Sequence, residues 1–181
     1  MSNESQSLLK EIKKPGILRL ILNEPKNKNA LSKKMISDLK EAISLALSDD
    51  SVKVIIIAAN GNVYSAGHDL KEITDARTHK DGGNSYFKDL FNSCSDLMKL
   101  IVECPKPIIA EVNGVATAAG CQLIASCDLA ISSNNSVKLN VSSFSWKEDF
   151  VNCKYSLSIF SISSISFENL SIRFLSFINA N

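Results

Sequence analysis

Apolar residues recur along residues 16–132 in two spacings, one typical of buried strands and one typical of amphipathic helices. Short runs rich in β-branched residues, each bounded by polar residues or proline, predict strands covered on both faces. Runs with apolar residues three and four positions apart predict helices with one buried face. The predicted strands are residues 16–22, 53–59, 108–112 and 128–132, and the predicted helices are residues 32–49, 84–103 and a short one that opens in the small-residue segment 116–120 and runs to 126. This alternation predicts an α/β layered domain, in which strand 53–59 pairs with strand 16–22.

The chain changes character near residue 136. All seven glycines and all four prolines lie at or before Gly120, whereas residues 136–181 contain twelve serines and six of the eight phenylalanines. Turns between packed elements usually use Gly, Pro, Asn or Asp, so the later segment has weak turn signals. We therefore divide the chain into a domain at residues 1–135 and a divergent Ser- and Phe-rich tail at residues 136–181. We do not expect this tail to pack as a continuation of the domain.

Composition narrows the classes of protein that need to be considered. The 181 residues are 45% hydrophobic and 22% charged, which fits one globular domain. Twenty Lys and Arg against nineteen Asp and Glu leave a net charge of +1, which gives no basis for nucleic-acid binding. No apolar run approaches the roughly 20 residues of a membrane-spanning helix. Five cysteines without a Cys-x-x-Cys pair, and two histidines without ligand spacing, indicate a reduced protein without a metal site.

Two loops rich in small residues carry the candidate chemistry. Residues 63–72 follow strand 53–59 and turn tightly at Gly67, and residues 113–122 lead into the short helix. Small residues let a ligand approach backbone N–H groups, and a helix start adds the favourable end of its dipole. Two such N–H groups facing one point form an oxyanion hole. Composition alone favours a simpler interpretation, in which Ala and Gly merely allow close packing of two strand-to-helix connections.

Several motifs follow one another across residues 10–134. They are Asn-Glu-Pro-Lys at residues 23–26 with Asn-Ala-Leu at 29–31, Ser-Ala-Gly-His-Asp-Leu-Lys-Glu at 65–72, Ile-Ala-Glu-Val-Asn-Gly at 109–114, Ala-Gly-Cys-Gln-Leu at 119–123 and Cys-Asp-Leu-Ala at 127–130. In this order and spacing they resemble the enoyl-CoA hydratase/isomerase (crotonase) superfamily. The resemblance implies a crotonase-like spiral of ββα units, here C-terminally incomplete. It also implies an acyl-CoA thioester as ligand, no metal, no cofactor beyond the coenzyme A of the substrate, and a homo-trimer or hexamer.

By position, the resemblance assigns an oxyanion hole to the backbone N–H groups of His68 and Ala119. An enolate-like transition state places negative charge on the thioester oxygen, and each fixed N–H group contributes on the order of 3 kcal/mol at such sites. The resemblance also offers Lys26 or Lys28 for the nucleotide phosphates at the mouth of the channel, with a solvated loop position as the alternative for both lysines. The residues expected to line the acyl-CoA channel are Ala66, Asp69, Leu70, Lys71 and Gly120.

The two carboxylates that hydration needs are not found in this sequence. One carboxylate deprotonates the attacking water and the other supplies the proton at the α carbon. The resemblance places the first at Gln122, whose amide neither gains nor loses a proton near neutral pH. It places the second near Ser142, where the sequence offers no equivalent. His68, Glu72 and Glu111 are possible substitutes, with a structural role as the alternative for each.

Three functions stay open on the sequence. The favoured one is an acyl-CoA-binding protein of fatty-acid metabolism that polarises the thioester but lacks hydratase activity. The second is an active hydratase or isomerase with a non-standard base. The third is a non-catalytic regulatory or interaction protein, such as a truncated variant that associates with complete subunits.

The compartment also has two interpretations. The family resemblance implies a mitochondrial protein. Residues 1–14, however, contain Glu4 and Glu11, no arginine and no amphipathic presequence. If the start is complete, we expect a cytoplasmic protein.

Overall fold

A computed structural model describes residues 6–132. Strands and helices follow one another along this part of the chain, which confirms the predicted α/β class. Their bounds in chain order are β1 Leu8–Lys14, β2 Ile17–Leu22, the 3-10 helix η1 Pro25–Asn27, α1 Lys33–Leu47, β3 Val54–Ala59, β4 Val63–Ser65, α2 Leu70–Ala76, α3 Asn84–Val102, β5 Ile108–Val112, β6 Val115–Ala116, α4 Ala119–Ser126 and β7 Leu129–Ser132. The tail at residues 136–181, and with it the prediction about its packing, lies outside the described residues.

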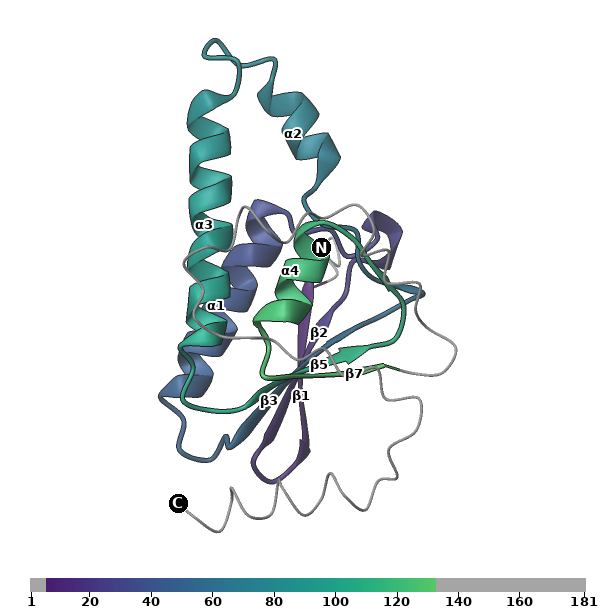
Figure 1. Ribbon diagram of the computed structural model, residues 1–181, viewed down its shortest axis with the longest axis vertical. Helices are drawn as coiled ribbons and strands as arrows, with labels where there is room; N and C mark the ends of the chain where they lie inside the picture. Colours follow the sequence, from purple (N-terminus) through teal and green to yellow (C-terminus); the bar gives the residue numbers. More distant parts are fainter. Residues whose placement is uncertain (1–5, 133–181) are drawn as a thin grey trace, which may run out of the picture.

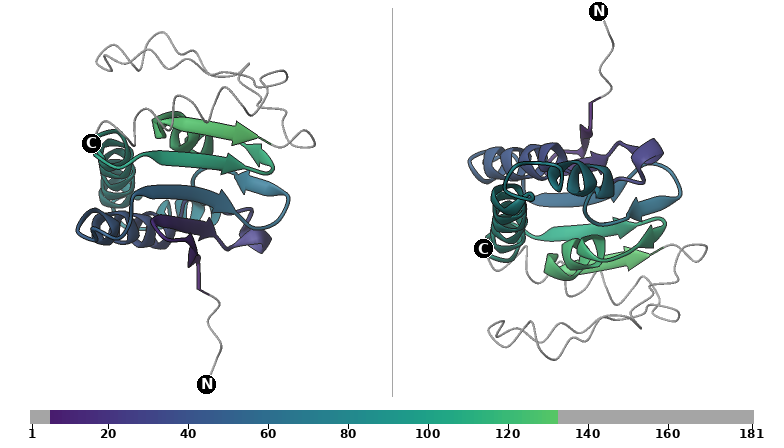
Figure 2. Two further views of the ribbon diagram at one scale, coloured as in Figure 1. Left: turned by 90° about the horizontal axis from the view of Figure 1, so that it is seen from below. Right: turned by 90° about the horizontal axis from the view of Figure 1, so that it is seen from above.

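Five strands form the main sheet in the order β1, β2, β3, β5 and β7, and Figure 2 shows them side by side. β1 runs antiparallel to β2, and the other neighbours are parallel. The predicted pairing of residues 53–59 with residues 16–22 is confirmed, with Leu20 opposite Ile57. β1 was missed because only Leu8 of its seven residues is buried and lysines interrupt its apolar pattern.

Helices α1, α3 and α4 form the second layer of the domain, and α3 packs against both of the others (Figure 1). The start predicted for α1 at residue 32 is confirmed, because the Ser32 hydroxyl accepts a hydrogen bond from the N–H of Met35 at 3.1 Å. The buried stripe of α1 then continues through Leu39 and Ile43. These side chains share one core with the alternate residues of β2, β3 and β5 that face the helices.

A second, two-stranded sheet pairs β4 with β6 in parallel. The sequence did not predict it, because strands of two or three residues are too short to show an alternating pattern. Residues 63–72, expected as one loop, therefore divide into β4, a short loop and α2. Each strand of the second sheet follows directly on a strand of the main sheet.

Glu111 lies on the face of the main sheet that is opposite its apolar neighbours Ala110 and Val112. Its two carboxylate oxygens accept hydrogen bonds from Nε and Nη2 of Arg19, both at 2.8 Å. Glu11 on β1 adds a third contact to the same guanidinium, at 3.3 Å. A bidentate pair of this kind fixes both side chains. The structural alternative for Glu111 is therefore confirmed.

The two edges of the main sheet differ in charge. β1 carries Lys10, Lys13 and Lys14, and its pairing with β2 shifts register near its end. Charges and irregular pairing are devices by which natural proteins keep an exposed edge from pairing with other chains. β7 has the sequence Leu-Ala-Ile-Ser, without a charge, and all four residues are exposed.

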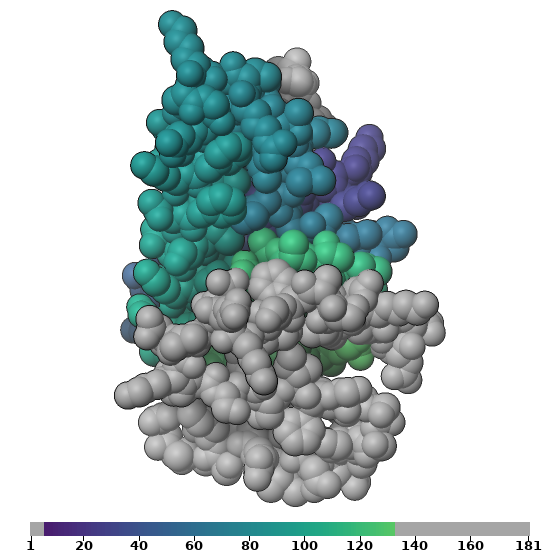
Figure 3. Space-filling view, turned by 45° about the horizontal axis from the view of Figure 1, so that its top comes forward, coloured from purple at the N-terminus to yellow at the C-terminus, as the bar shows by residue number. Residues whose placement is uncertain are grey.

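The pair formed by α2 and α3 extends beyond the end of the main sheet, as Figure 1 shows, and its teal atoms form the upper part of the space-filling view in Figure 3. α3 is the longest helix that the structure describes, with 19 residues. Among residues 6–132, no helix has both the length and the apolar character needed to span a membrane.

Candidate functional site

Two loops of the same construction lie side by side at the end of the second sheet. The first loop, residues 66–69, joins β4 to α2, and the second loop, residues 117–118, joins β6 to α4. They are neighbours because β4 and β6 pair in parallel. Thr117 ties them together: its N–H donates to the carbonyl of Ser65 and its hydroxyl donates to the carbonyl of Ala66, both at 3.0 Å.

The first loop is held by the side chain of Asp69. This carboxylate caps α2 by accepting from the N–H of Lys71 at 2.8 Å, and it accepts from Nδ2 of Asn27 at 2.5 Å. Burial by itself raises the pKa of Asp69, but these hydrogen bonds, with one from the N–H of Glu72, outweigh it and hold the pKa below its ordinary value. Asp69 is thus a charged cap that anchors the loop to η1.

The backbone of the first loop is clamped from the other side by the segment that precedes α1. The N–H of Leu31 donates to the carbonyl of Gly67 at 2.7 Å, and the N–H of Ala66 donates to the carbonyl of Lys28 at 3.0 Å. Gly67 has a φ of +85°, a conformation that residues with a Cβ atom rarely adopt. The predicted tight turn at Gly67 is confirmed.

The second loop is held by close backbone packing. Ala118 has a φ of +48° and no side-chain hydrogen bond caps α4. A Cβ atom on Gly120 would lie 2.5 Å from the carbonyl oxygen of Ser65, so only glycine fits there. The helix starts at Ala119, inside the segment where the sequence predicted its opening.

The two loops meet where the resemblance placed the oxyanion hole. A Cβ atom on Gly67 would lie 3.2 Å from the backbone nitrogen of Ala119 and 3.0 Å from the Cβ of Ala118. Among the backbone hydrogen bonds of residues 6–132, none uses the N–H of His68 or of Ala119 as its donor. Ala119 is the first residue of α4, and the first turn of a helix leaves its N–H groups free at the positive end of the helix dipole. His68 lies one residue before Asp69, the cap of α2.

The imidazole of His68 turns toward α3. It lies edge-on to the ring of Phe91, with centroids 5.4 Å apart. Its Nδ1 atom is buried and has no hydrogen-bond partner in the described part of the chain. Burial lowers the pKa of His68, while the Leu31 backbone and the charge of Glu72 raise it by less.

Glu72 has a structural role, as the sequence allowed. Its carboxylate accepts from the hydroxyl of Tyr86 at 2.7 Å and from the N–H of Lys33 at 3.1 Å. It therefore connects the starts of α1 and α2 with α3. Burial, followed by the bond to Glu72, raises the pKa of Tyr86 well above its ordinary value.

The remaining predicted residues surround the two loops. Leu70 is 73% exposed at the start of α2, and Lys71 beside it is also exposed. Gln122 is half-buried in the first half of α4, and within residues 6–132 its side chain has no hydrogen bond. Lys26 and Lys28 are exposed on and beside η1, whose residue Asn27 contacts the first loop.

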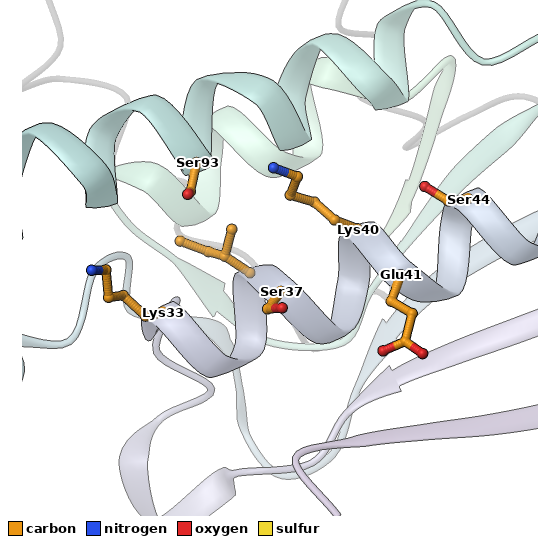
Figure 4. Close-up of a pocket in the computed structure, with 7 residues that line it drawn as sticks. Lys33, Ser37, Lys40, Glu41, Ser44 and Ser93 are labelled. Carbon is orange, nitrogen blue, oxygen red and sulfur yellow. The ribbon is translucent and has the colours of Figure 1, made fainter.

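No metal ligand set occurs in the described part of the chain: no three His, Cys, Asp or Glu side chains come together within residues 6–132. An open groove of about 350 Å³ lies elsewhere, between α1 and α3. In Figure 4 the side chains of Lys33 and Lys40 extend along this groove, and each lies 3.6 Å from an aspartate of α3. The groove contains none of the predicted site residues.

Sequence reasoning missed three residues that shape the site: Asn27, Tyr86 and Phe91. They contact Asp69, Glu72 and His68, respectively, from 42, 14 and 23 positions away along the chain. No local pattern marks such partners, because the contacts arise only when α3 and η1 pack around the first loop.

The sequence of this chain is similar to those of known proteins. The family model described as enoyl-CoA hydratase/isomerase matches residues 12–146, which extends past the residue-134 limit of the motifs. The chain is 51% identical over 121 residues to the mitochondrial enoyl-CoA hydratase domain-containing protein 3 of Xenopus laevis, covering 67% of this chain and 40% of that protein. It is 32% identical over 123 residues to the 2,3-dehydroadipyl-CoA hydratase of Escherichia coli, covering 66% and 44%.

Solved structures of proteins of the same kind are also similar to this fold. Human enoyl-CoA hydratase domain-containing protein 3 superposes with a TM-score of 0.65 at 41% identity, over 72% of this chain and 49% of that one. An enoyl-CoA hydratase of Mycobacterium smegmatis gives 0.66 at 41% identity, over 73% and 49%. These matches show the crotonase fold that the resemblance implied. The chain spans less than half the length of the curated relatives it matches.

Proposed function

Because the chain belongs to the enoyl-CoA hydratase/isomerase family, we propose that it binds an acyl-CoA thioester between its two loops and lacks hydratase activity. The observation that carries the proposal is the placement of two unused N–H groups, those of His68 and Ala119, where the loops meet. The names of its relatives, such as the 2,3-dehydroadipyl-CoA hydratase, support a CoA thioester as the ligand class.

The thioester carbonyl oxygen is the group that these N–H donors suit. Each donor held at the position of a developing negative charge contributes on the order of 3 kcal/mol. Both donors belong to the backbone, so the side chains at the two positions are free to vary. The exposed side chain of Leu70 provides an apolar surface beside the loops for an acyl chain.

Hydration requires a base for the attacking water, and the two carboxylates that the sequence offered as substitutes already have structural partners. Glu72 accepts from Tyr86 and from a backbone N–H, and Glu111 is paired with Arg19. The Nδ1 atom of His68 is buried. These contacts argue against a substitute base and support binding without turnover.

A paired measurement tests the proposal. We expect butyryl-CoA to bind the full chain in a calorimetric titration, and crotonyl-CoA to be hydrated at background rate. The variant Gln122→Glu restores one carboxylate of two, so hydration should rise only slightly, although general acid–base groups contribute roughly 10²–10⁴-fold in complete sites. Brisk turnover by the unmodified chain would contradict binding-only function, and absent binding would contradict the site itself.

The uncharged edge of β7 supports a second candidate function, association with another subunit of this family. Ile131 is 43% exposed on a strand that lacks the charges of β1. If this edge is an interface, sedimentation velocity of the chain mixed with a complete member of the family should show a complex that the variant Ile131→Lys loses. A mixture in which the two proteins sediment separately at every concentration would contradict the association.

We also propose a mitochondrial location. The support is the word mitochondrial in the names of the frog, zebrafish and human relatives. A fusion of residues 1–30 to a fluorescent reporter should then co-localise with mitochondria. A diffuse cytosolic signal would favour the cytoplasmic alternative.

A further inference from the structure

The imidazole of His68 occupies a setting that thioester binding by its backbone does not require. The ring is wedged edge-on against Phe91, with an interplanar angle of 78°. Its Nδ1 atom is buried without a hydrogen-bond partner in the described residues. The buried Nδ1 atom does not reach a ligand bound outside, so its effect on the ligand passes through the backbone of His68.

The charged groups on the first loop and on α2 do little to stabilise a protonated His68 ring. Glu72 on α2 attracts such a proton, but its carboxylate already accepts from Tyr86 and from the N–H of Lys33. Asp69, the next residue in the loop, is bonded to Asn27 and caps its own helix. Within residues 6–132 neither carboxylate forms an ion pair with the ring, and the bonds described hold each of them to another partner.

The helices packed around the loop provide no stronger partner. α3 presents the uncharged ring of Phe91 to His68. From α1, the ammonium of Lys33 lies over the ring of Tyr86, 4.7 Å from its centroid, and 3.6 Å from Asp89. The neighbouring segment before α1 contributes the Leu31 backbone. The site therefore suits a neutral imidazole.

We propose that His68 is a positioning residue whose neutral imidazole holds its own backbone N–H toward the thioester, and whose protonation releases the first loop so that acyl-CoA binding weakens in acid. The inference rests on the function proposed above. It assigns a side-chain role at a position where the binding chemistry uses only the backbone.

The direction of the pH effect follows from the environment of the ring. Burial holds the pKa of His68 below its ordinary value of 6.5, so the folded protein favours the neutral ring. The neutral ring therefore contributes fully to the stability of the folded protein above pH 6.5. This contribution is lost as the pH falls from 6.5 through the lowered pKa of His68. A ligand that needs the neutral form lowers this pKa further. Its affinity then falls by up to about tenfold per pH unit below the midpoint of the free protein.

The experiment is a butyryl-CoA titration of the full chain from pH 8 to pH 5, with His68→Gln and His79→Gln as a matched pair. His79 is exposed and is the other histidine of the chain. His79→Gln should keep the wild-type profile, including any change due to ionisation of the ligand. His68→Gln should bind at pH 8 and lose affinity less steeply in acid, so that the ratio of the two affinities is constant at high pH and changes by up to about tenfold per pH unit below the midpoint of the free protein.

Parallel profiles for the two variants would overturn the inference while leaving acyl-CoA binding intact. Absence of binding by the wild type at pH 8 would overturn the proposed function, and this inference with it. A second measurement does not depend on the folding of His68→Gln: in His79→Gln, NMR follows the one remaining ring. Its titration midpoint should be lower with butyryl-CoA bound than without, and equal midpoints would overturn the proposal.

Discussion

The two loops at the candidate site have the same topology and opposite means of support. The first loop, between β4 and α2, is anchored by a charged side chain: Asp69 caps the helix and binds Asn27. The second, between β6 and α4, has no side-chain cap, and Gly120 packs its backbone directly on Ser65. A loop held by hydrogen bonds can be weakened in steps and by pH. A loop held by contact distance tolerates almost no added atom.

This difference also explains which residue types each loop needs. The polar residues of the first loop have definite hydrogen-bond partners, so replacing one of them removes the contacts that hold the loop. The second loop needs small residues at Ala118 and Gly120, and its contribution to a ligand is the N–H of Ala119. Four substitutions test this comparison, beginning with the one of largest expected effect.

Gly120→Ala should be the most damaging change at the site. The added Cβ would lie 2.5 Å from the Ser65 carbonyl, so β4 and α4 must separate. Overpacking of this kind costs about 3 kcal/mol. Urea unfolding followed by circular dichroism measures the loss. Gly82→Ala is the comparison variant: a Cβ there meets nothing within 4 Å, so only the strain of its φ of +64° lowers the stability. Equal losses in the two variants would show that contact distance does not hold the second loop.

Gly67→Ala should lower the stability less than Gly120→Ala does, and it should weaken ligand binding more. A residue with a Cβ atom at φ +85° is strained by roughly 1–3 kcal/mol, and the new methyl group would press on Ala118 and the nitrogen of Ala119. We expect butyryl-CoA affinity to fall more than tenfold at a temperature where the variant is still folded. Unchanged affinity would show that butyryl-CoA does not bind where the two loops meet.

Asp69→Ala should lower the free energy of unfolding by about 1 kcal/mol at pH 7, the usual value of a helix cap. Because the native pKa of Asp69 lies below 3.8, its contribution is present above pH 3.8 and disappears as the pH falls through the native pKa. Unfolding curves of wild type and variant should therefore converge in acid. Asp75→Ala, an exposed change on the same helix, is the control variant. A constant gap between wild type and Asp69→Ala would refute the charged cap.

Ala118→Gly should have the smallest effect, and it should be stabilising. Glycine relieves the strain of φ +48° but adds flexibility to the unfolded chain, so the net gain is about 0.5 kcal/mol or less. A rise in the thermal midpoint of a degree or two would match this balance. A clear loss of stability would mean that the methyl group of Ala118 makes a needed contact with the first loop.

Local pattern was sufficient for the large elements of this protein. The apolar spacing of α1 and the hydroxyl of Ser32 before it specify a helix, its buried face and its start, because these signals lie within a few residues of one another. The runs that became β2, β3 and β5 were equally clear. The motifs at residues 65–72 and 119–123 also pointed to the family and its ligand class before any contact was known.

Tertiary structure alone decided how the site is assembled. β4 and β6 have three and two residues, too few for a periodic signal, yet their pairing brings Gly67 to the nitrogen of Ala119, about fifty positions away. Tertiary packing likewise gave Glu72 its partner Tyr86 and His68 its neighbour Phe91. The physical reason is that backbone N–H groups and carboxylates occur all along the chain, and only packing determines which of them stay free and which are already bound.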